Sequence, residues 1–374
     1  MRAQIRLVVA ALICTLAGIA GCAPPAPLPS TSPAPAAPDV DYAHVEESIE
    51  SAIRSGSAEL DNVRAVLVVV DGQTKIAHYR HGFTATDHEH IFSATKSVVS
   101  TLIGIAVADG LIPSLDAPLA DLLPEHRDQM EPEVAKVTLR QLLTMSAGFA
   151  PYPSDDDEQS ILAGKLDLVG WAVSMGQDTT AGTEFRYSDV SAHLAAAVLL
   201  SSLRHHPATR NQTVLDYARE RLFDPLGIST RPAYEDLPMT KNSEFDRAGF
   251  AWMRLRDLHL GGFGIRLTAE DMVKLGRLYL DDGMWHGKRV LPEGWVQQAT
   301  APSPVASYYG MFWWRDTQWG LPLFAARGAR GQRIVVVPDR RAVIVTLCLT
   351  ATDTPMSDGA IEPIINDKIL FALR

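Results

Sequence analysis

Two strand-forming regions at opposite ends of the chain constrain the fold more than any other feature. Residues 62–82, "NVRAVLVVVDGQTKIAHYRHG", hold two β-branched runs on either side of Asp71-Gly72, a dipeptide typical of hairpin turns. Near the C-terminus, "YYGMFWWRD", "GLPLFAARG" and "QRIVVVPDRRAVIVTLCLT" predict four or five more strands, and the pattern of residues 361–373 predicts a closing helix. Residues 94–298 are mainly helical in pattern. The sequence therefore predicts an α+β fold, with an antiparallel sheet built from both termini, flanking helices and an inserted, mainly helical lobe.

The N-terminal residues indicate export. Two arginines precede an apolar run from Leu7 to Gly21, which is too short for a comfortable membrane span and typical of a secretory signal. The run ends in "IAGC", which resembles the bacterial lipobox and implies cleavage before Cys22 and lipid attachment to its sulfur. A plain secretory signal with an incidental cysteine is the alternative. We expect a signal peptide over 1–21, lipidated Cys22 and a proline-rich tether over 22–41, and one globular domain over 42–374.

Charge and cysteine content limit the possible binding partners and disulfides of the protein. Without the two arginines of the signal, 32 of the 34 basic residues remain against 44 acidic ones, a formal charge of −12, which disfavours a nucleic-acid partner. Once Cys14 leaves with the signal and Cys22 carries lipid, only Cys348 remains, so no intrachain disulfide is available. The acidic and histidine run at 87–90 lacks further ligands, and we expect no metal and no cofactor. The oligomeric state stays open.

The stretch "HIFSATKSVVSTLIGIAVADG", residues 90–110, carries the chemistry. Its apolar residues recur at helical spacing, and Ser93 is a good N-cap type, so we expect a largely buried helix that begins near Ser93. Lys96 lies three residues later on the same face. Burial and the helix end would push this lysine toward its neutral form, in which it accepts the serine proton. Taken alone, the motif favours a capping serine beside a solvated lysine, because this spacing occurs by chance in most large proteins.

Two further segments strengthen the catalytic interpretation. Tyr187-Ser188-Asp189 precedes an aliphatic helix, and Ala326-Arg327-Gly328 precedes a strand. In order with Ser93-Ala94-Thr95-Lys96, they resemble the three motifs of the penicillin-recognising serine hydrolases, the beta-lactamase-related family. Surrounding segments such as "VTLRQLLTMSAGF" and "YARERLFDPLGIS" are similar to sequences of the branch that contains class C beta-lactamases, family VIII esterases and 6-aminohexanoate-dimer hydrolases. The resemblance runs from about residue 60 to 350.

The resemblance implies an acyl-transfer site. Ser93 would attack a carbonyl, Lys96 would take its proton, and Tyr187 would relay a proton to the leaving group. The backbone N–H groups of Ser93 and Ala329 would form an oxyanion hole. Substrate would lie against the third motif, which consists of Ala326, Arg327 and Gly328.

Two departures from the family pattern bear on the substrate. Asp189 stands where many relatives have asparagine, and we interpret it as a helix cap alongside Ser188. Ala326 stands where many relatives have lysine or histidine, and Arg327 should point to the opposite face of its strand. We therefore expect weak hydrolysis of penicillins and of D-alanyl-D-alanine peptides.

The function that we favour is a membrane-anchored serine hydrolase acting on small-molecule amides or short-chain esters, a bacterial lipoprotein with its domain on the extracytoplasmic side. Two alternatives stay open. One is a beta-lactamase or D-alanyl-D-alanine carboxypeptidase, and the other is a non-catalytic cell-envelope binding protein of the same fold.

Overall fold

The computed structural model describes residues 39–150, 167–231, 235–237, 249–350 and 355–374. The predicted signal and almost all of the tether lie outside these residues, as do most of the loops expected at 151–160 and 230–250. No helix in the described ranges is long and apolar enough to cross a membrane.

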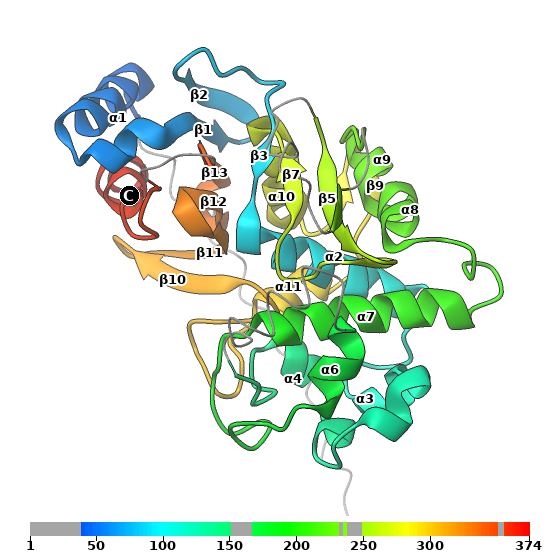
Figure 1. Cartoon of the computed structure of the whole chain (residues 1–374). Coiled ribbons are helices and arrows are strands. Elements are labelled where there is room, and N and C mark those ends of the chain that lie inside the picture. Colours follow the sequence, from blue (N-terminus) through cyan, green and yellow to red (C-terminus); the bar gives the residue numbers. More distant parts are fainter. Residues whose placement is uncertain (1–38, 151–166, 232–234, 238–248, 351–354) are drawn as a thin grey trace, which may run out of the picture. The chain divides into compact units, whose positions relative to one another are not determined.

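A six-stranded antiparallel sheet joins the two ends of the chain, as predicted (Figure 1). Its strand order is β10-β11-β12-β13-β1-β2, and the N-terminal strand β1 pairs with the C-terminal strand β13 from Val70 opposite Ala342 to Val63 opposite Cys348. The strands are β1 (Val63–Val70), β2 (Gln73–Tyr79), β10 (Trp314–Gln318), β11 (Leu321–Gly328), β12 (Gln332–Val337) and β13 (Ala342–Cys348).

The turn between β1 and β2 follows from its sequence. Asp71 and Gly72 both adopt positive φ, 50° and 74°, which a type I′ hairpin turn requires and which Asp-Gly tolerates well. Every side chain of β13 is buried, because helices cover both faces of the sheet. Cys348 therefore lies in the core, as expected, and burial raises the pKa of its thiol to about 12.

One face of the sheet packs against helices from both termini. The apolar cluster on this face joins helix α1 (Tyr42–Ser55) to the closing helix, which runs through Ile364–Leu370 and α12 (Phe371–Leu373). On the other face, a larger cluster includes α10 (Ala269–Leu280) and α2 (Thr95–Ala108). The α-helices elsewhere in the described residues are α3 (Leu119–Leu122), α4 (Leu139–Leu143), α6 (Leu168–Ser174), α7 (Asp189–His205), α8 (Val214–Ala218), α9 (Asp224–Leu226) and α11 (Trp295–Thr300).

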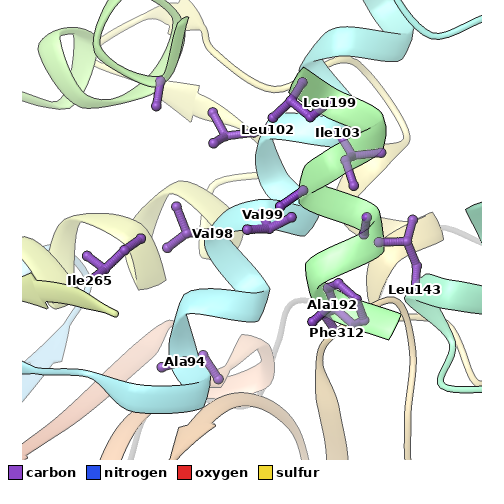
Figure 2. Packing of buried hydrophobic residues seen from close by; sticks show 14 of the residues in the cluster. Ala94, Val98, Val99, Leu102, Ile103, Leu143, Ala192, Leu199, Ile265 and Phe312 are labelled. Carbon is purple, nitrogen blue, oxygen red and sulfur yellow. The ribbon is translucent and has the colours of Figure 1, made fainter. Parts of the chain in front are cut away.

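Helix α2 is the centre of the larger cluster (Figure 2). Val99 and Ile103 pack toward Ala192 and Leu199 of α7, and twelve consecutive residues from Thr95 to Ala106 are buried. A helix that is buried on all sides has little freedom to shift, so the residues at its start have fixed positions.

A second, smaller sheet was not predicted. Its strand order is β3-β7-β5-β4, and β6 pairs with β5. These strands have two to five residues. Such short strands show no clear alternation of apolar and polar residues, so the sequence does not distinguish them from the helical segments around them. They are β3 (Glu89–His90), β4 (Glu235–Leu237), β5 (Ala251–Leu255), β6 (Leu258–His259) and β7 (Ile265–Leu267), and a separate hairpin joins β8 (Met284–Trp285) to β9 (Lys288–Arg289).

Candidate active site

Ser93 and Lys96 lie on one continuous segment at the start of α2. Ser93 is in a single 3₁₀ turn, Phe92–Ala94, and α2 begins at Thr95. Ser93 is therefore not the N-cap that its residue type suggested, and no side chain caps this helix start. Its hydroxyl instead accepts a hydrogen bond of 3.0 Å from Lys96 Nζ. The predicted pair is in contact, with Ser93 partly exposed and the side chain of Lys96 only 1% exposed.

Three acceptors surround the Lys96 ammonium. Besides Ser93 Oγ at 3.0 Å, Nζ lies 2.5 Å from Asp189 Oδ1 and 2.7 Å from the carbonyl oxygen of Gly262. A protonated lysine has three N–H donors, so these three contacts satisfy it completely. A buried charge is tolerated only when it is paired and hydrogen-bonded in this way.

The charge state of Lys96 differs from the expectation. Burial is the largest single influence and lowers the pKa of Lys96, but Asp189 and Tyr187 together raise the pKa by more, through charge and hydrogen bonding, and the net pKa lies above the ordinary lysine value. The prediction of a neutral lysine is therefore wrong. It considered burial and the helix end, and it missed a carboxylate that lies 93 residues further along the chain.

Asp189 does not have the capping role that its position suggested. The N-cap of α7 is Ser188, whose hydroxyl accepts a hydrogen bond of 3.4 Å from the Ser191 amide. Asp189 is the first residue of the helix, and its side chain, 17% exposed, pairs with Lys96. Tyr187, two residues earlier and partly buried, places its ring centroid 4.8 Å from Lys96 Nζ. The second motif therefore delivers both a phenol and a carboxylate to Lys96.

The Gly261-Gly262 backbone was not identified from the sequence as part of the site. A Cβ on Gly262 would lie 3.0 Å from Asp189 Oδ1 and 3.2 Å from His193 Cε1, and one on Gly261 would lie 2.0 Å from the Ala192 carbonyl oxygen. Only glycine lets this backbone approach α7 so closely. The Nδ1 atom of His193 accepts from the amides of Gly261 at 3.2 Å and Gly262 at 3.4 Å. His193 thereby holds the carbonyl that binds Lys96.

The end of β11 supplies the second predicted amide. A Cβ on Gly328 would lie 2.0 Å from the Ile91 carbonyl oxygen, so glycine allows β11 to pack directly against the segment that carries Ser93. Ser93 and Ala329 line one cavity. Within the described residues, neither of their amides donates to a side chain or to a loop carbonyl. The arrangement leaves two N–H donors for an oxygen atom in the cavity.

The backbone beside both amides is in an unusual conformation. Phe92, directly before Ser93, has φ 46°, and Arg330, directly after Ala329, has φ 60°. The Arg330 guanidinium lies 5.4 Å from the centroid of the Phe92 ring, and its amide donates to Asp358 Oδ1 at 2.9 Å. Non-glycine residues adopt such angles at a cost, and they do so mainly where surrounding contacts fix a functional geometry.

The cavity beside Ser93 has a volume of about 470 Å³, within the usual range for small-molecule sites. An aromatic wall continues from Tyr187, whose ring stacks on Trp314 at 5.7 Å, to the guanidinium of Arg327, 5.6 Å from the Trp314 centroid. The lining residues are Ser93, Tyr187, Trp314, Arg327, Gly328, Ala329, Arg333, Asp358, Gly359 and Glu362.

Two arginines line this cavity in different states. Arg333 is 5% exposed and donates to Glu362 Oε1 at 3.0 Å, to the Gly328 carbonyl at 2.6 Å and to the Asp358 carbonyl at 2.5 Å. Arg327 is 30% exposed, and its hydrogen-bond contact within the described residues is Asp316 Oδ2 at 3.5 Å. Arg333 is therefore a structural ion-pair partner, whereas Arg327 has donors available to a ligand.

The expectation for the third motif is half right. Ala326 and Arg327 do lie on opposite faces of β11, opposite Ile334 and Arg333 of β12 respectively. Ala326 packs with Ile334 in the core and does not line the cavity, whereas Arg327 does. The conclusion that Arg327 faces away from the site is therefore wrong, because the cavity extends around the end of β11 onto the Arg327 face.

Known proteins resemble the chain over most of its length. It is 23% identical over 308 residues to 6-aminohexanoate-dimer hydrolase of Paenarthrobacter ureafaciens, covering 76% of this chain and 71% of that one. It is 26% identical over 325 residues to penicillin-binding protein 4 of Amycolatopsis lactamdurans, covering 76% and 79%. The crystal structure of a family VIII carboxylesterase has the same fold, with a TM-score of 0.65, 15% identity and coverage of 89% and 97%. The beta-lactamase family model matches residues 60–365, and the chain therefore belongs to the beta-lactamase family.

Proposed function

We propose that this serine hydrolase of the beta-lactamase family cleaves amide or short-chain ester bonds through an acyl-enzyme on Ser93. The observation that carries the proposal is the contact between Ser93 Oγ and the buried Lys96 Nζ, 3.0 Å long, beside a cavity that Ser93 itself lines. A hydroxyl with a proton-transfer partner in contact is the usual arrangement of an activated serine.

The remaining groups have complementary roles. The oxygen of the attacked carbonyl binds the amides of Ser93 and Ala329, which stabilise the charge that develops there. Lys96, in contact with Ser93 Oγ, takes part in removing the serine proton, and Tyr187 donates a proton to the leaving group as the tetrahedral intermediate collapses. Water then attacks the acyl-enzyme by the same route and releases the acid. The chain needs no metal ion or other cofactor for any of these steps.

The cavity favours a substrate with an apolar group beside the scissile bond. Tyr187 and Trp314 stack against each other along its wall and give an apolar surface next to Ser93. The name of the Paenarthrobacter relative supports an amide substrate. Short-chain esters undergo the same acyl transfer with a better leaving group.

A specific observation keeps a second candidate function open, that of a beta-lactamase or D-alanyl-D-alanine carboxypeptidase. Such substrates carry a carboxylate, and Arg327 presents a guanidinium to the Ser93 cavity, with one long hydrogen bond, to Asp316, within the part of the chain that the structure describes. Guanidinium groups bind carboxylates well, and this one can do so without breaking a strong internal bond. The weak penicillin hydrolysis expected from Ala326 alone therefore needs a direct measurement.

Labelling with a fluorophosphonate probe tests the proposed function. The wild-type protein should react, Ser93→Ala should not, and the neighbouring Ser97→Ala should react like wild type, because Ser97 is buried and donates to the Phe312 carbonyl. Hydrolysis of p-nitrophenyl butyrate should follow the same order. A wild-type protein that neither reacts nor hydrolyses the ester would instead support the non-catalytic binding protein.

We also propose that the domain is held at the outer side of a bacterial membrane by lipid on Cys22. The support is the signal-like run that ends in "IAGC" and the seven prolines in residues 23–38 that follow it. Cys22→Ala should move the protein from the membrane fraction to the soluble fraction, because acyl chains provide the attachment. Unchanged membrane retention of that variant would contradict the proposal.

A further inference from the structure

Asp189 stands where the family pattern has asparagine, and it contacts the amine that the proposed mechanism uses. Lys96 Nζ donates to Ser93 Oγ, Asp189 Oδ1 and the Gly262 carbonyl, so all three of its protons are in use. An ammonium in this state has no lone pair for the Ser93 proton. One of its protons must leave before, or while, the serine proton arrives.

We propose that Asp189 is the final acceptor of the Ser93 proton and that Lys96 relays it. This inference rests on the proposed function. Of the three contacts, Asp189 Oδ1 is the nearest to Nζ, at 2.5 Å, and it is the only one that can take up a proton and become neutral. The Gly262 carbonyl holds Nζ in place but cannot serve as a base.

The step balances without another reactant. The O–H bond of Ser93 breaks and its proton bonds to Nζ, while a different N–H bond of Nζ breaks and that proton bonds to Asp189 Oδ1. The Ser93 oxygen forms a bond to the carbonyl carbon, and the carbonyl π electrons move to the oxygen held by the amides. Lys96 is an ammonium before and after the step, and Asp189 changes from a carboxylate to a carboxylic acid. When the leaving group departs, Tyr187 donates its hydroxyl proton to it, Lys96 passes a proton to the Tyr187 oxygen, and the proton on Asp189 Oδ1 passes to Lys96, so that Tyr187 is again a phenol, Lys96 an ammonium and Asp189 a carboxylate.

The other titratable groups around Lys96 do not compete for this role. Burial lowers the pKa of His193 to about 4, and its Nδ1 already accepts two backbone amides. Burial raises the pKa of Tyr309, whose ring packs against that of Tyr187, so the Tyr309 hydroxyl stays protonated and adds no anion beside Lys96. Tyr187 places its ring centroid 4.8 Å from Nζ and also interacts with Lys96 through a side-chain hydrogen bond, but the proposed mechanism uses its hydroxyl as the donor to the leaving group. Asp189 is thus the anion that faces Lys96 among the described residues.

The competing mechanism makes the opposite prediction. If a small fraction of neutral Lys96 were the base, Asp189 would only hinder catalysis by holding Lys96 charged. Asp189→Asn would then lower the pKa of Lys96 and raise activity at neutral pH. Under the proposal, the same substitution removes the proton acceptor and lowers activity. Asparagine has the same shape as aspartate, so the two mechanisms differ in the sign of one measurement.

The experiment measures kcat/KM for p-nitrophenyl butyrate in wild type, Asp189→Asn and Asp189→Glu from pH 5 to 10, with thermal unfolding as a folding control. We expect Asp189→Asn to lose about 10²- to 10⁴-fold at pH 7, the usual range for general acid–base groups, and to regain activity as Lys96 deprotonates at high pH. Asp189→Glu, which keeps a carboxylate, should recover part of the loss. In mixtures of H₂O and D₂O, acylation by wild type should depend quadratically on the deuterium fraction, since two protons move, and the dependence should become linear in Asp189→Asn.

Each outcome has a distinct meaning. An Asp189→Asn variant that is folded and as active as wild type, or more active, overturns the relay while the labelling of Ser93 still supports the proposed function. A loss in Asp189→Asn that is equal at every pH, with no recovery in Asp189→Glu, also overturns the relay and leaves Asp189 a structural role. A wild-type protein without Ser93-dependent hydrolysis overturns the proposed function and this inference with it.

Discussion

Two cations flank the proposed nucleophile, and their surroundings differ sharply. Among the described residues, Lys96 is 1% exposed and has three acceptors within 3.0 Å, whereas Arg327 is 30% exposed and has one acceptor at 3.5 Å. A buried ammonium with complete hydrogen bonding has one position and one charge state. The partly exposed guanidinium of Arg327 can turn toward a ligand that enters the cavity. The comparison indicates that the Lys96 side determines the reaction and the Arg327 side determines which molecules undergo it.

The largest expected effect comes from removing the buried cation. Lys96→Met should lower kcat/KM for p-nitrophenyl butyrate by about 10²- to 10⁴-fold, because proton transfer is lost. It should also lower the melting temperature, since Asp189 then lacks its ionic partner. The double variant Lys96→Met/Asp189→Asn should recover stability but not activity. Wild-type activity in Lys96→Met would show that the lysine takes no part in the reaction.

The second prediction concerns the support of Lys96 by His193. Burial lowers the pKa of His193 to about 4, whereas an unfolded chain has the ordinary value near 6.5. Between these values the unfolded state binds more protons, so the free energy of unfolding falls as the pH drops from about 6.5 to 4, by roughly 3 kcal/mol. Above pH 6.5 the contribution of His193 is fully present.

Urea unfolding of wild type and His193→Gln at pH 7.5 and 4.5 checks this prediction. Glutamine can still accept from the Gly262 amide but does not titrate, so the variant should lose less stability in acid than wild type. His206→Gln, an exposed substitution just after α7, is the matched control and should behave as wild type. His90, whose pKa burial lowers to about 3, should leave some acid sensitivity in every protein. Equal acid sensitivity in His193→Gln and wild type would contradict the prediction.

The third prediction tests whether a lysine at residue 326, the third-motif position where many relatives have lysine or histidine, can act in this cavity. Ala326 is fully buried beside Ile334, so Ala326→Lys would force a long, charged side chain into the core. Overpacking alone typically costs about 1 to 3 kcal/mol. We expect a lower urea midpoint and no gain in nitrocefin hydrolysis, whereas Arg327→Lys should unfold like wild type. A stable Ala326→Lys variant that gains activity on nitrocefin would show that residue 326 reaches the cavity.

Much of the fold and part of the site follow from the sequence. The hairpin at Asp71-Gly72 was predictable because turn residues act over short distances. The joining of β1 to β13 was predictable because both ends of the chain hold β-branched runs that need strand partners. The contact of Ser93 with Lys96 was predictable for the same reason, since three residues separate them. The carboxylate and the carbonyl that hold Lys96 were not, because they lie 93 and 166 residues away and meet Lys96 only after α2, α7 and the Gly261-Gly262 backbone have packed together.

The third motif shows how a correct local rule can still give a wrong conclusion. Alternation along β11 placed Ala326 and Arg327 on opposite faces, and the structure agrees. Which face borders the cavity depends on the position of Ser93 relative to the end of β11, which the strand itself does not encode. Gly328 was a usable signal, because its close approach to the Ile91 carbonyl brings the strand end beside Ser93.

The smallest expected effect comes from replacing Arg327, the partly exposed cation. This substitution distinguishes a residue that binds substrate from one that takes part in the reaction. Arg327→Gln should lower kcat/KM for nitrocefin, which carries a carboxylate, by about tenfold or roughly 1.4 kcal/mol, while p-nitrophenyl butyrate, which carries none, should be hydrolysed as by wild type. The effect is modest because Arg327 is partly exposed and water screens its charge. Arg315→Gln on β10, whose side chain donates to the Ser307 carbonyl and does not line the cavity, should change neither rate. Because the loss should appear in KM for the anionic substrate, an equal loss on both substrates would place Arg327 with Lys96 in the chemistry and remove the distinction between the two cations.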